Sequence, residues 1–337
     1  MPDRRQALPT FLAVAGWGDA VREPLAGDAS PRRYERLRRG GETAVLMDAD
    51  PATGEDVRPF LHIARHLAAL GLSPPAVLAG APDDGFLLLE DLGDDLYARV
   101  VAADPGAEPA LYDAAVDVLA HLQAHPPPAG LASYDPAAMG AAAALAVEWY
   151  ARAVTGAATD AAPLADAVAT AVAALDRPAV IALRDYHAEN LIWLPGREGI
   201  RRVGLLDFQS AELAPPEYDL VSLVQDARRD VTPAAVTAAL RRHADARGDA
   251  LAVTEAAVAV MGAQRALRIL GVFARLSLRD GKPGYIRLIP RVWGQLQQNL
   301  AAPALAPLAR IVAQALPPPS PQALERIAAQ CAAAPMR

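Results

Sequence analysis

The hydrophobic and polar positions follow two different periods along the chain. In the first part, short apolar runs alternate with turn residues, and two β-prone runs, 34–38 and 43–47, flank Gly40 and Gly41. A Gly-Gly pair between such runs is typical of a β-hairpin. After about residue 96 the apolar residues recur mainly at helical spacing. The pattern therefore predicts an α+β protein, with a small antiparallel sheet first and a mainly helical remainder.

Apolar residues at helical spacing also follow Glu55 and predict a helix that buries Phe60, Ile63 and Leu67. The other elements predicted for the first part are a short helix over 8–17 and strands over 76–78 and 86–89. We place the boundary between the two parts at Gly93, so that an N-lobe covers 1–93 and a helical C-lobe covers 94–337.

Composition excludes several classes of protein. The net charge of −7 argues against a nucleic-acid-binding protein, which is normally basic. A single cysteine, Cys331, can form neither an internal disulfide nor a cysteine metal cluster, which fits a reducing compartment. No apolar run approaches the roughly 20 residues that span a bilayer, and no apolar leader follows Met1. We expect a cytoplasmic, monomeric protein that binds neither nucleic acid nor a membrane.

The candidate chemistry lies between residues 183 and 209. Asp185 is followed five residues later by Asn190, and Asp207 ends an apolar run. Phosphoryl transfer from ATP uses a carboxylate that orients the acceptor hydroxyl, together with an amide oxygen and a second carboxylate that hold Mg²⁺ on the phosphates. The spacing matches the kinase catalytic loop and the metal-binding Asp-Phe element. We therefore expect Asp185 to be catalytic and Asn190 and Asp207 to bind Mg²⁺.

A β-hairpin is predicted between these two pieces. The apolar runs 191–194 and 200–206 flank a turn that contains Pro195 and Gly196. Such a hairpin would place Asn190 and Asp207 side by side on one metal ion.

Nucleotide contacts are expected at two places in the N-lobe. Gly27, Ser30 and Arg32 precede the first hairpin, where backbone N–H groups and a cation can approach phosphate oxygens, although the same segment also fits a surface turn with solvated arginines. The link after strand 86–89 reads as a hinge, where backbone groups near Glu90 and Leu92 would contact adenine.

The lysine that a kinase carries on its third strand is missing. Met47 occupies its expected position, so either an arginine of the preceding loop replaces the lysine or Mg²⁺ and backbone groups hold the phosphates. An ion-pair role for Glu55 is then in doubt, since an acidic residue in a first helical turn also favours the helix dipole.

Two features of the C-lobe complete the candidate site. Asp219 follows Pro215 and Pro216, where it suits a helix N-cap, and a carboxylate at this place in a kinase steadies the catalytic loop. A concentration of arginines, unusual in an acidic chain, follows in the later helices. It suits either a solvated face or a pocket for an anionic acceptor, because arginine grips carboxylates bidentately. The arginines considered for acceptor binding are Arg265, Arg268, Arg275 and Arg279.

The order of these parts resembles the aminoglycoside phosphotransferase family over nearly the whole chain. Within that family, several motifs are similar to the anomeric N-acetylmuramate/N-acetylglucosamine 1-kinases of Gram-negative cell-wall recycling. They are Gly27-Asp28-Ala29-Ser30, Leu88-Leu89-Glu90-Asp91-Leu92-Gly93, Arg184-Asp185-Tyr186-His187, Leu206-Asp207-Phe208-Gln209, Tyr218-Asp219-Leu220-Val221-Ser222-Leu223 and Arg279-Asp280-Gly281-Lys282. The resemblance implies a bilobal protein-kinase-like fold, ATP and Mg²⁺ as cofactors, and phosphorylation of an amino sugar on its anomeric hydroxyl.

Two departures separate the chain from the antibiotic kinases of this family. Leu183-Arg184-Asp185 stands in place of His-Gly-Asp, and Met47 stands in place of the lysine. The arginines would also repel a polycationic aminoglycoside, whereas they suit the carboxylate of N-acetylmuramate. A kinase of another small alcohol or of an aminoglycoside, and a non-catalytic nucleotide-binding regulator, remain the alternatives.

Overall fold

The computed structural model describes residues 4–25 and 32–333, and the chain forms two compact units. Unit 1 comprises Met1–Val118 and Ala188–Ala211, and unit 2 comprises Leu119–His187 and Glu212–Arg337. Residues 94–118 therefore belong to the same unit as the sheet that precedes them in the chain. The lobe boundary that we place at Gly93 stays a prediction.

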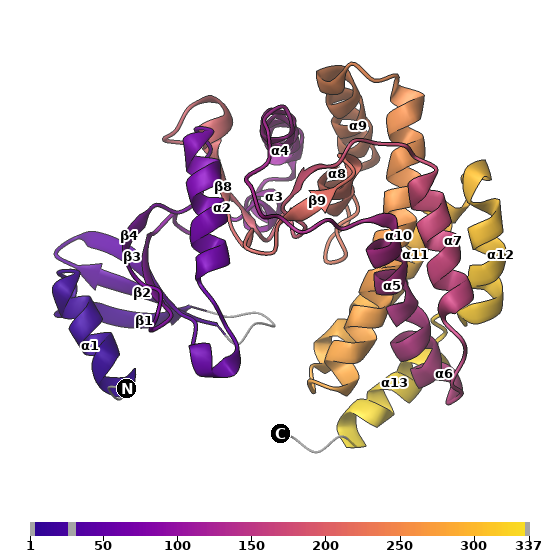
Figure 1. The fold of residues 1–337 in the computed structure, drawn as a ribbon, viewed down its shortest axis with the longest axis horizontal. Coiled ribbons are helices and arrows are strands. Elements are labelled where there is room, and N and C mark those ends of the chain that lie inside the picture. Colours follow the sequence, from indigo (N-terminus) through magenta and orange to yellow (C-terminus); the bar gives the residue numbers. More distant parts are fainter. Residues whose placement is uncertain (1–3, 26–31, 334–337) are drawn as a thin grey trace. The chain divides into compact units, whose positions relative to one another are not determined.

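Unit 1 is built on a five-stranded antiparallel sheet in the order β1-β2-β3-β5-β4 (Figure 1). The predicted hairpin is confirmed, because β2 and β3 pair through seven residues around Gly40 and Gly41. The strand β1 was not predicted, since its alternation of polar and apolar residues is weak. The strands are β1 (Val21–Leu25), β2 (Arg33–Arg39), β3 (Glu42–Asp48), β4 (Val77–Ala81) and β5 (Phe86–Glu90).

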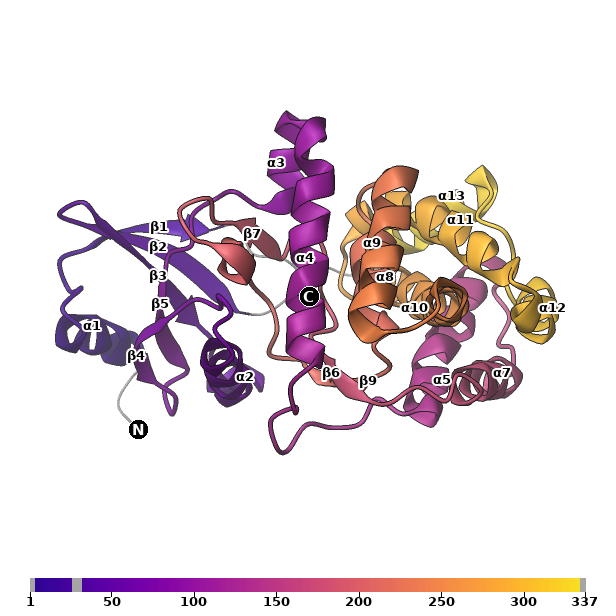
Figure 2. The same cartoon turned by 90° about the horizontal axis from the view of Figure 1, so that it is seen from above.

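Helices α1 (Arg4–Val14) and α2 (Arg58–Ala69) lie against opposite faces of this sheet (Figures 1 and 2). Leu12 of α1 packs in one buried cluster with Leu46 and Leu88, which are paired across β3 and β5. The helix expected over 8–17 thus begins four residues earlier and ends at Val14. The prediction for α2 is confirmed, since its buried residues include Phe60, Ile63 and Leu67.

The rest of unit 1 contains the second predicted hairpin. Strand β7 (Leu191–Trp193) pairs with β8 (Val203–Leu205), which is shorter than the predicted run because Gly199–Arg202 form a 3₁₀ turn. Ser73 holds the hairpin against the sheet side of unit 1: its carbonyl accepts from the N–H of Leu205 at 2.9 Å. Helix α3 (Tyr97–Ala103) lies in this unit, and α4 (Glu108–Gln123) begins in it and continues into unit 2.

Unit 2 is mainly helical and is organised around the long helix α10 (Leu251–Leu278) (Figure 1). Helices α5, α8 and α11 pack against α10, as does a π-helical turn over Ala146–Ala151. A short antiparallel pair, β6 (Val180–Ala182) and β9 (Glu212–Ala214), flanks the segment that carries Asp185. The other helices of unit 2 are α5 (Pro136–Leu145), α6 (Arg152–Thr155), α7 (Ala162–Ala173), α8 (Glu217–Val224), α9 (Pro233–Arg247), α11 (Ile289–Leu300), α12 (Ala306–Ala315) and α13 (Pro321–Ala333).

Helix α10 is an apolar helix that is mostly buried inside unit 2. It is long and apolar enough to cross a membrane by length and composition, but 72% of its most apolar window is buried inside the protein, as in the core helix of a globular unit. Gly271 allows it to approach α5 closely, because a Cβ at this position would collide with the backbone of Leu145.

Candidate functional site

The metal-binding residues expected from the sequence lie at the open end of the β7–β8 hairpin in unit 1. Asn190 immediately precedes β7, and Asp207 follows β8 by two residues. The backbone carbonyl of Asn190 accepts from the N–H of Leu206 at 3.0 Å, next to the pair Leu191 and Leu205. The hairpin thus brings Asn190 beside the residue that precedes Asp207, as its spacing predicts.

The backbone of Asp207 is held in an unusual conformation. Its φ of 56° is in the left-handed region, which non-glycine residues enter rarely and at an energetic cost. The next residue, Phe208, is fully buried and stacks on Phe60 of α2, with ring centroids 4.8 Å apart. Gln209 donates from Nε2 to Oδ1 of Asp207 at 2.5 Å. These contacts direct an exposed carboxylate away from the buried ring beside it.

Asn190 and Asp207 offer the oxygen ligands that Mg²⁺ prefers, one from an amide and one from a carboxylate. The amide of Gln209 donates to Oδ1 of Asp207, and no group within residues 4–25 and 32–333 donates to Oδ2. A divalent cation bound here would take its other ligands from water or from phosphate oxygens. The residues therefore fit Mg²⁺, although their role as ligands stays a prediction.

A cation from the residue that precedes β2 lies in the same unit as Asp207. Arg32 donates from Nε to Oε2 of Glu55 at 2.6 Å, and both side chains are less than one-fifth exposed. Burial raises the pKa of Tyr34, the positive charge of Arg32 lowers it and the negative charge of Asp207 raises it, so these three side chains share one electrostatic environment. Met47, which pairs with Tyr34 across β2 and β3, is buried and apolar.

The remaining nucleotide contacts expected in unit 1 fall into two groups. Gly27 and Ser30 lie outside the described residues. Glu90 ends β5, where its N–H already donates to the carbonyl of Ala76 at 2.8 Å and its carboxylate pairs with Arg197. Leu92 packs toward Gly204, where an added Cβ would lie 3.0 Å from Cδ1 of Leu92. The roles of Glu90 and Leu92 toward adenine stay predictions.

In unit 2, Asp219 is bonded to the backbone beside Asp185. Its Oδ2 accepts from the N–H of Leu183 at 2.6 Å and its Oδ1 accepts from the N–H of Arg184 at 2.9 Å. Asp219 is fully buried, and burial raises its pKa to about 6, although the two backbone N–H groups and the charge of Arg265 oppose this rise. The N-cap interpretation of Asp219 is wrong: α8 begins at Glu217, so Asp219 lies inside its first turn and points into the core.

The four arginines considered for acceptor binding have different surroundings in unit 2. Arg265 is buried and donates to the carbonyl of Arg184 and to the hydroxyl of Ser222. Arg279, which follows α10, is exposed and pairs with Asp280 at 2.6 Å. The role of all four as acceptor ligands stays a prediction.

Arg268 and Arg275 differ from the other two. Within residues 4–25 and 32–333, no side-chain hydrogen bond or ion pair involves either guanidinium. Burial lowers the pKa of Arg275, and the positive charges of Arg279 and Arg268 lower it further. Burial also opposes the charge of Arg268, but Tyr218, Tyr134, Asp185 and Glu212 lie close enough to raise its pKa. Two partly buried cations on one helix thus have no counter-ion bonded to them in the part of the chain that the structure describes.

Sequence reasoning missed Ser222 and Glu212, which also contact the segment before Asp185. Glu212 accepts from Nη1 of Arg184 at 2.7 Å, and the hydroxyl of Ser222 donates to the carbonyl of Arg184 at 3.3 Å. Ser222 follows Asp219 by three residues on one helix, a spacing that places both on the same face and could have signalled it. Glu212 lies 28 residues from Arg184, and no local signal indicates that pairing.

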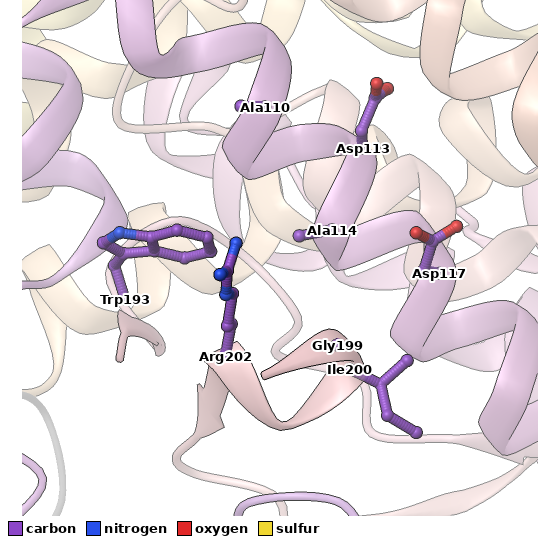
Figure 3. Close-up of a pocket in the computed structure, with 8 residues that line it drawn as sticks. All are labelled: Ala110, Asp113, Ala114, Asp117, Trp193, Gly199, Ile200 and Arg202. Atoms are coloured by element: carbon purple, nitrogen blue, oxygen red, sulfur yellow. The ribbon is translucent and has the colours of Figure 1, made fainter. Parts of the chain in front are cut away.

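A cavity of about 240 Å³ lies elsewhere in unit 1, between α4 and the turn of the hairpin (Figure 3). Asp113 and Asp117 line it from successive turns of α4, opposite Trp193 and Arg202. Arg202 lies over the ring of Trp193 at 5.8 Å. None of the site residues expected from the sequence lines this cavity.

The chain is similar to proteins of a known family. Residues 21–255 match the phosphotransferase enzyme family. The N-acetylmuramate/N-acetylglucosamine kinase of Caulobacter vibrioides is 42% identical over 91% of this chain and 95% of its own, and the enzyme of the same name from Pseudomonas aeruginosa is 35% identical over 91% and 93%. The crystal structure of a choline kinase from Streptococcus pneumoniae has the same fold, with a TM-score of 0.64 at 13% identity over 87% of this chain and 99% of that one.

The chain belongs to the phosphotransferase enzyme family and is a small-molecule kinase with an α+β, protein-kinase-like fold. The family resemblance and the fold expected from the sequence are both confirmed. The two relatives named N-acetylmuramate/N-acetylglucosamine kinase each match 91% of this chain.

Proposed function

We propose that this kinase transfers the γ-phosphoryl group of ATP to the anomeric hydroxyl of N-acetylmuramate, of N-acetylglucosamine or of both, and so produces the sugar 1-phosphate. Such a product suits the reuse of cell-wall sugars in the cytoplasm, where ATP is available. The relatives that share 35–42% of the sequence support the sugar class. The single observation that carries the acceptor is the pair of arginines on α10, Arg268 and Arg275, which bond to no counter-ion within residues 4–25 and 32–333.

These arginines suit the acid group that distinguishes the two sugars. N-acetylmuramate carries a lactyl carboxylate, whereas N-acetylglucosamine has no charge. A guanidinium binds a carboxylate through two parallel N–H donors, and the bond is strong where water is partly excluded. Arg268 lies near enough to Asp185 for the carboxylate of Asp185 to raise its pKa. An anionic sugar held by Arg268 would therefore be bound near the proposed catalytic residue.

The chain's own residues have distinct tasks in this proposal. Asp185 accepts or orients the proton of the sugar hydroxyl as its oxygen attacks phosphorus. An anomeric hydroxyl is more acidic than an ordinary alcohol, so that its position should matter more than the strength of the base. In unit 1, Asn190 and Asp207 would hold Mg²⁺, which when bound supplies positive charge to the phosphate oxygens. Arg32, fixed by Glu55, supplies the cation that Met47 does not.

The experiment is an acceptor panel. We would measure ADP release with Mg²⁺ and ATP in the presence of N-acetylmuramate, N-acetylglucosamine, glucose, choline or kanamycin, and locate the new phosphate by phosphorus NMR. Phosphate on C1 of an acetamido sugar is the expected result. Phosphate on choline or kanamycin would replace the proposed acceptor, and binding of ATP without any acceptor-dependent ADP release would replace the enzyme by a nucleotide-binding regulator.

A further inference from the structure

The backbone immediately before Asp185 is strained. Arg184 has a φ of 74°, in the left-handed region that non-glycine residues rarely occupy. The N–H of Asp185 donates to the carbonyl of Leu183 at 3.0 Å. A hydrogen bond that spans one residue of positive φ defines a tight, rare γ-turn, and such a conformation costs about 1–3 kcal/mol unless its surroundings hold it.

The peptide groups on both sides of Arg184 are held by unit 2. On the amino side, Oδ1 of Asp219 accepts from the N–H of Arg184 at 2.9 Å. On the carboxyl side, the carbonyl of Arg184 accepts from Nη1 of Arg265 at 3.1 Å and from the hydroxyl of Ser222 at 3.3 Å. Because each peptide group is planar, fixing the N–H and the carbonyl of one residue fixes both of its backbone dihedrals.

Arg265 is itself held in place. Its Nη2 donates to the hydroxyl of Ser222 at 2.7 Å, and its guanidinium lies over the ring of Tyr218 with 5.0 Å to the centroid. Only 5% of Arg265 is exposed. A planar guanidinium can direct separate N–H groups at the carbonyl and the hydroxyl at once, whereas an ammonium is a single point charge. Arg265 therefore has a fixed position, from which it holds the backbone of the segment before Asp185.

We propose that Arg265 and Ser222 are positioning residues, which hold the carbonyl of Arg184 and thereby aim the carboxylate of Asp185 at the acceptor hydroxyl. This inference rests on the proposed role of Asp185 in phosphoryl transfer. Arg265, which was considered as a ligand of the acceptor, instead binds the backbone carbonyl of Arg184. Arg268 and Arg275 then remain the arginines proposed to recognise the sugar.

The test combines kinetics with hydrogen exchange. In Arg265→Ala, we expect kcat to fall roughly 100-fold, the loss that a misplaced catalytic group commonly causes, while the KM values for nucleotide and sugar change less than about threefold. Free guanidinium should restore part of kcat in this variant, and Arg265→Lys should retain more activity than Arg265→Ala. Exchange of the amide hydrogens in a peptide over 181–187 should become faster in Arg265→Ala.

Ser222→Ala is the milder variant and covers the case in which Arg265→Ala fails to fold. It should lower kcat about fivefold, again without a change in KM, because the hydroxyl's bonds to the carbonyl of Arg184 and to Arg265 are lost while Arg265 still donates to that carbonyl. The matched control is Arg326→Ala, which also removes an arginine bonded to a backbone carbonyl, that of Val154 at 3.0 Å. We expect this control to change neither kcat nor exchange over 181–187.

Three outcomes separate this proposal from the proposed function. A selective rise in the KM for N-acetylmuramate with intact kcat would make Arg265 a sugar ligand and overturn the proposal. Unchanged exchange over 181–187 in Arg265→Ala would also overturn it. If the wild-type protein phosphorylates no acceptor but Arg265→Ala speeds exchange over 181–187, the proposed function fails while the backbone contact stands.

Discussion

Arg32 donates from Nε to Oε2 of Glu55 at 2.6 Å, and the side chains are only 12% and 17% exposed. The cation therefore comes from the residue before β2, and its carboxylate partner precedes α2. On β3, where a lysine would be expected, Met47 is buried. We propose that this arginine, which is mostly shielded from solvent and paired with a carboxylate, supplies the positive charge that a lysine would otherwise bring to the nucleotide.

We predict that Arg32→Ala weakens use of the nucleotide. If Arg32 donates to a phosphate, its loss removes a hydrogen bond between charged groups, worth about 1.5–3 kcal/mol, and kcat/KM for ATP falls roughly 10- to 100-fold. Steady-state kinetics at saturating sugar measures this. Arg22→Ala is the control, because Arg22 also pairs with a glutamate, Glu35, on the same sheet but is more exposed. Equal losses in the two variants would assign Arg32 a structural role only.

We predict opposite signatures for Asp185 and Asp207. Asp185→Asn should lower kcat roughly 10²- to 10⁴-fold, as expected for a residue that handles the reacting proton, and should leave nucleotide affinity intact. Asp207→Asn should weaken binding of ATP in Mg²⁺ and leave binding of ATP in EDTA unchanged. Calorimetric titration with each nucleotide form separates the two. Full turnover in Asp185→Asn would remove this residue from the chemistry.

We predict that Arg268→Met and Arg275→Met discriminate between the two sugars. Loss of a charged hydrogen bond to the lactyl carboxylate should reduce kcat/KM for N-acetylmuramate roughly 10- to 100-fold, whereas N-acetylglucosamine should change less than about threefold. Arg241, exposed on α9, is the control for loss of one positive charge in unit 2. A parallel loss for both sugars would contradict a role in recognising the carboxylate.

We predict that protonation of Asp219 at acid pH lowers turnover but stabilises the folded protein. Burial raises its pKa to about 6, so that below this pH it gains a proton and holds the N–H groups of Leu183 and Arg184 less well. Turnover should therefore fall below about pH 6. The measurement is kcat against pH, and the variant Asp219→Asn should lack this change near pH 6.

The same raised pKa has the opposite effect on stability. The folded protein binds this proton more tightly than the unfolded chain, so the contribution of Asp219 to stability is fully present below its unfolded pKa and is lost as the pH rises through about 6. Relative to Asp219→Asn, the free energy of unfolding of the wild-type protein should be about 1 kcal/mol greater at pH 5 than at pH 8. Urea unfolding at the two pH values checks this, and a difference of the opposite sign would mean that the pKa is lowered.

We predict that Gly271→Ala destabilises unit 2. An added Cβ would collide with the backbone of Leu145, which cannot move without shifting a helix, so unfolding should become easier by about 3 kcal/mol or more. Gly294→Ala is the control, because Gly294 is exposed on α11 and a Cβ there meets nothing within 4 Å. This control should gain up to about 1 kcal/mol from helix propensity. Thermal unfolding of both variants is the measurement.

The order of polar and apolar residues was sufficient to predict the elements that form from residues close together in the sequence. The Gly40-Gly41 turn, the helix that buries Phe60, and the hairpin between Asn190 and Asp207 all follow from spacing over fewer than 20 residues. The α+β class follows from the change of hydrophobic period, and the kinase class follows from three polar residues at defined spacing. Where the local signal was weak, as for β1 and the start of β8, the prediction missed the element or its length.

The tasks of the charged side chains were decided by tertiary structure. The sequence alone determined that Asp185, Asn190 and Asp207 are present at a kinase's spacing and that arginines gather after residue 264. Only the folded chain separates Arg265, which is bonded to Arg184 across 81 residues, from Arg268, which has no such bond. These two arginines are one helical turn apart and look alike in sequence. Burial and bonding partners depend on contacts between distant segments, and those contacts form only when the chain folds.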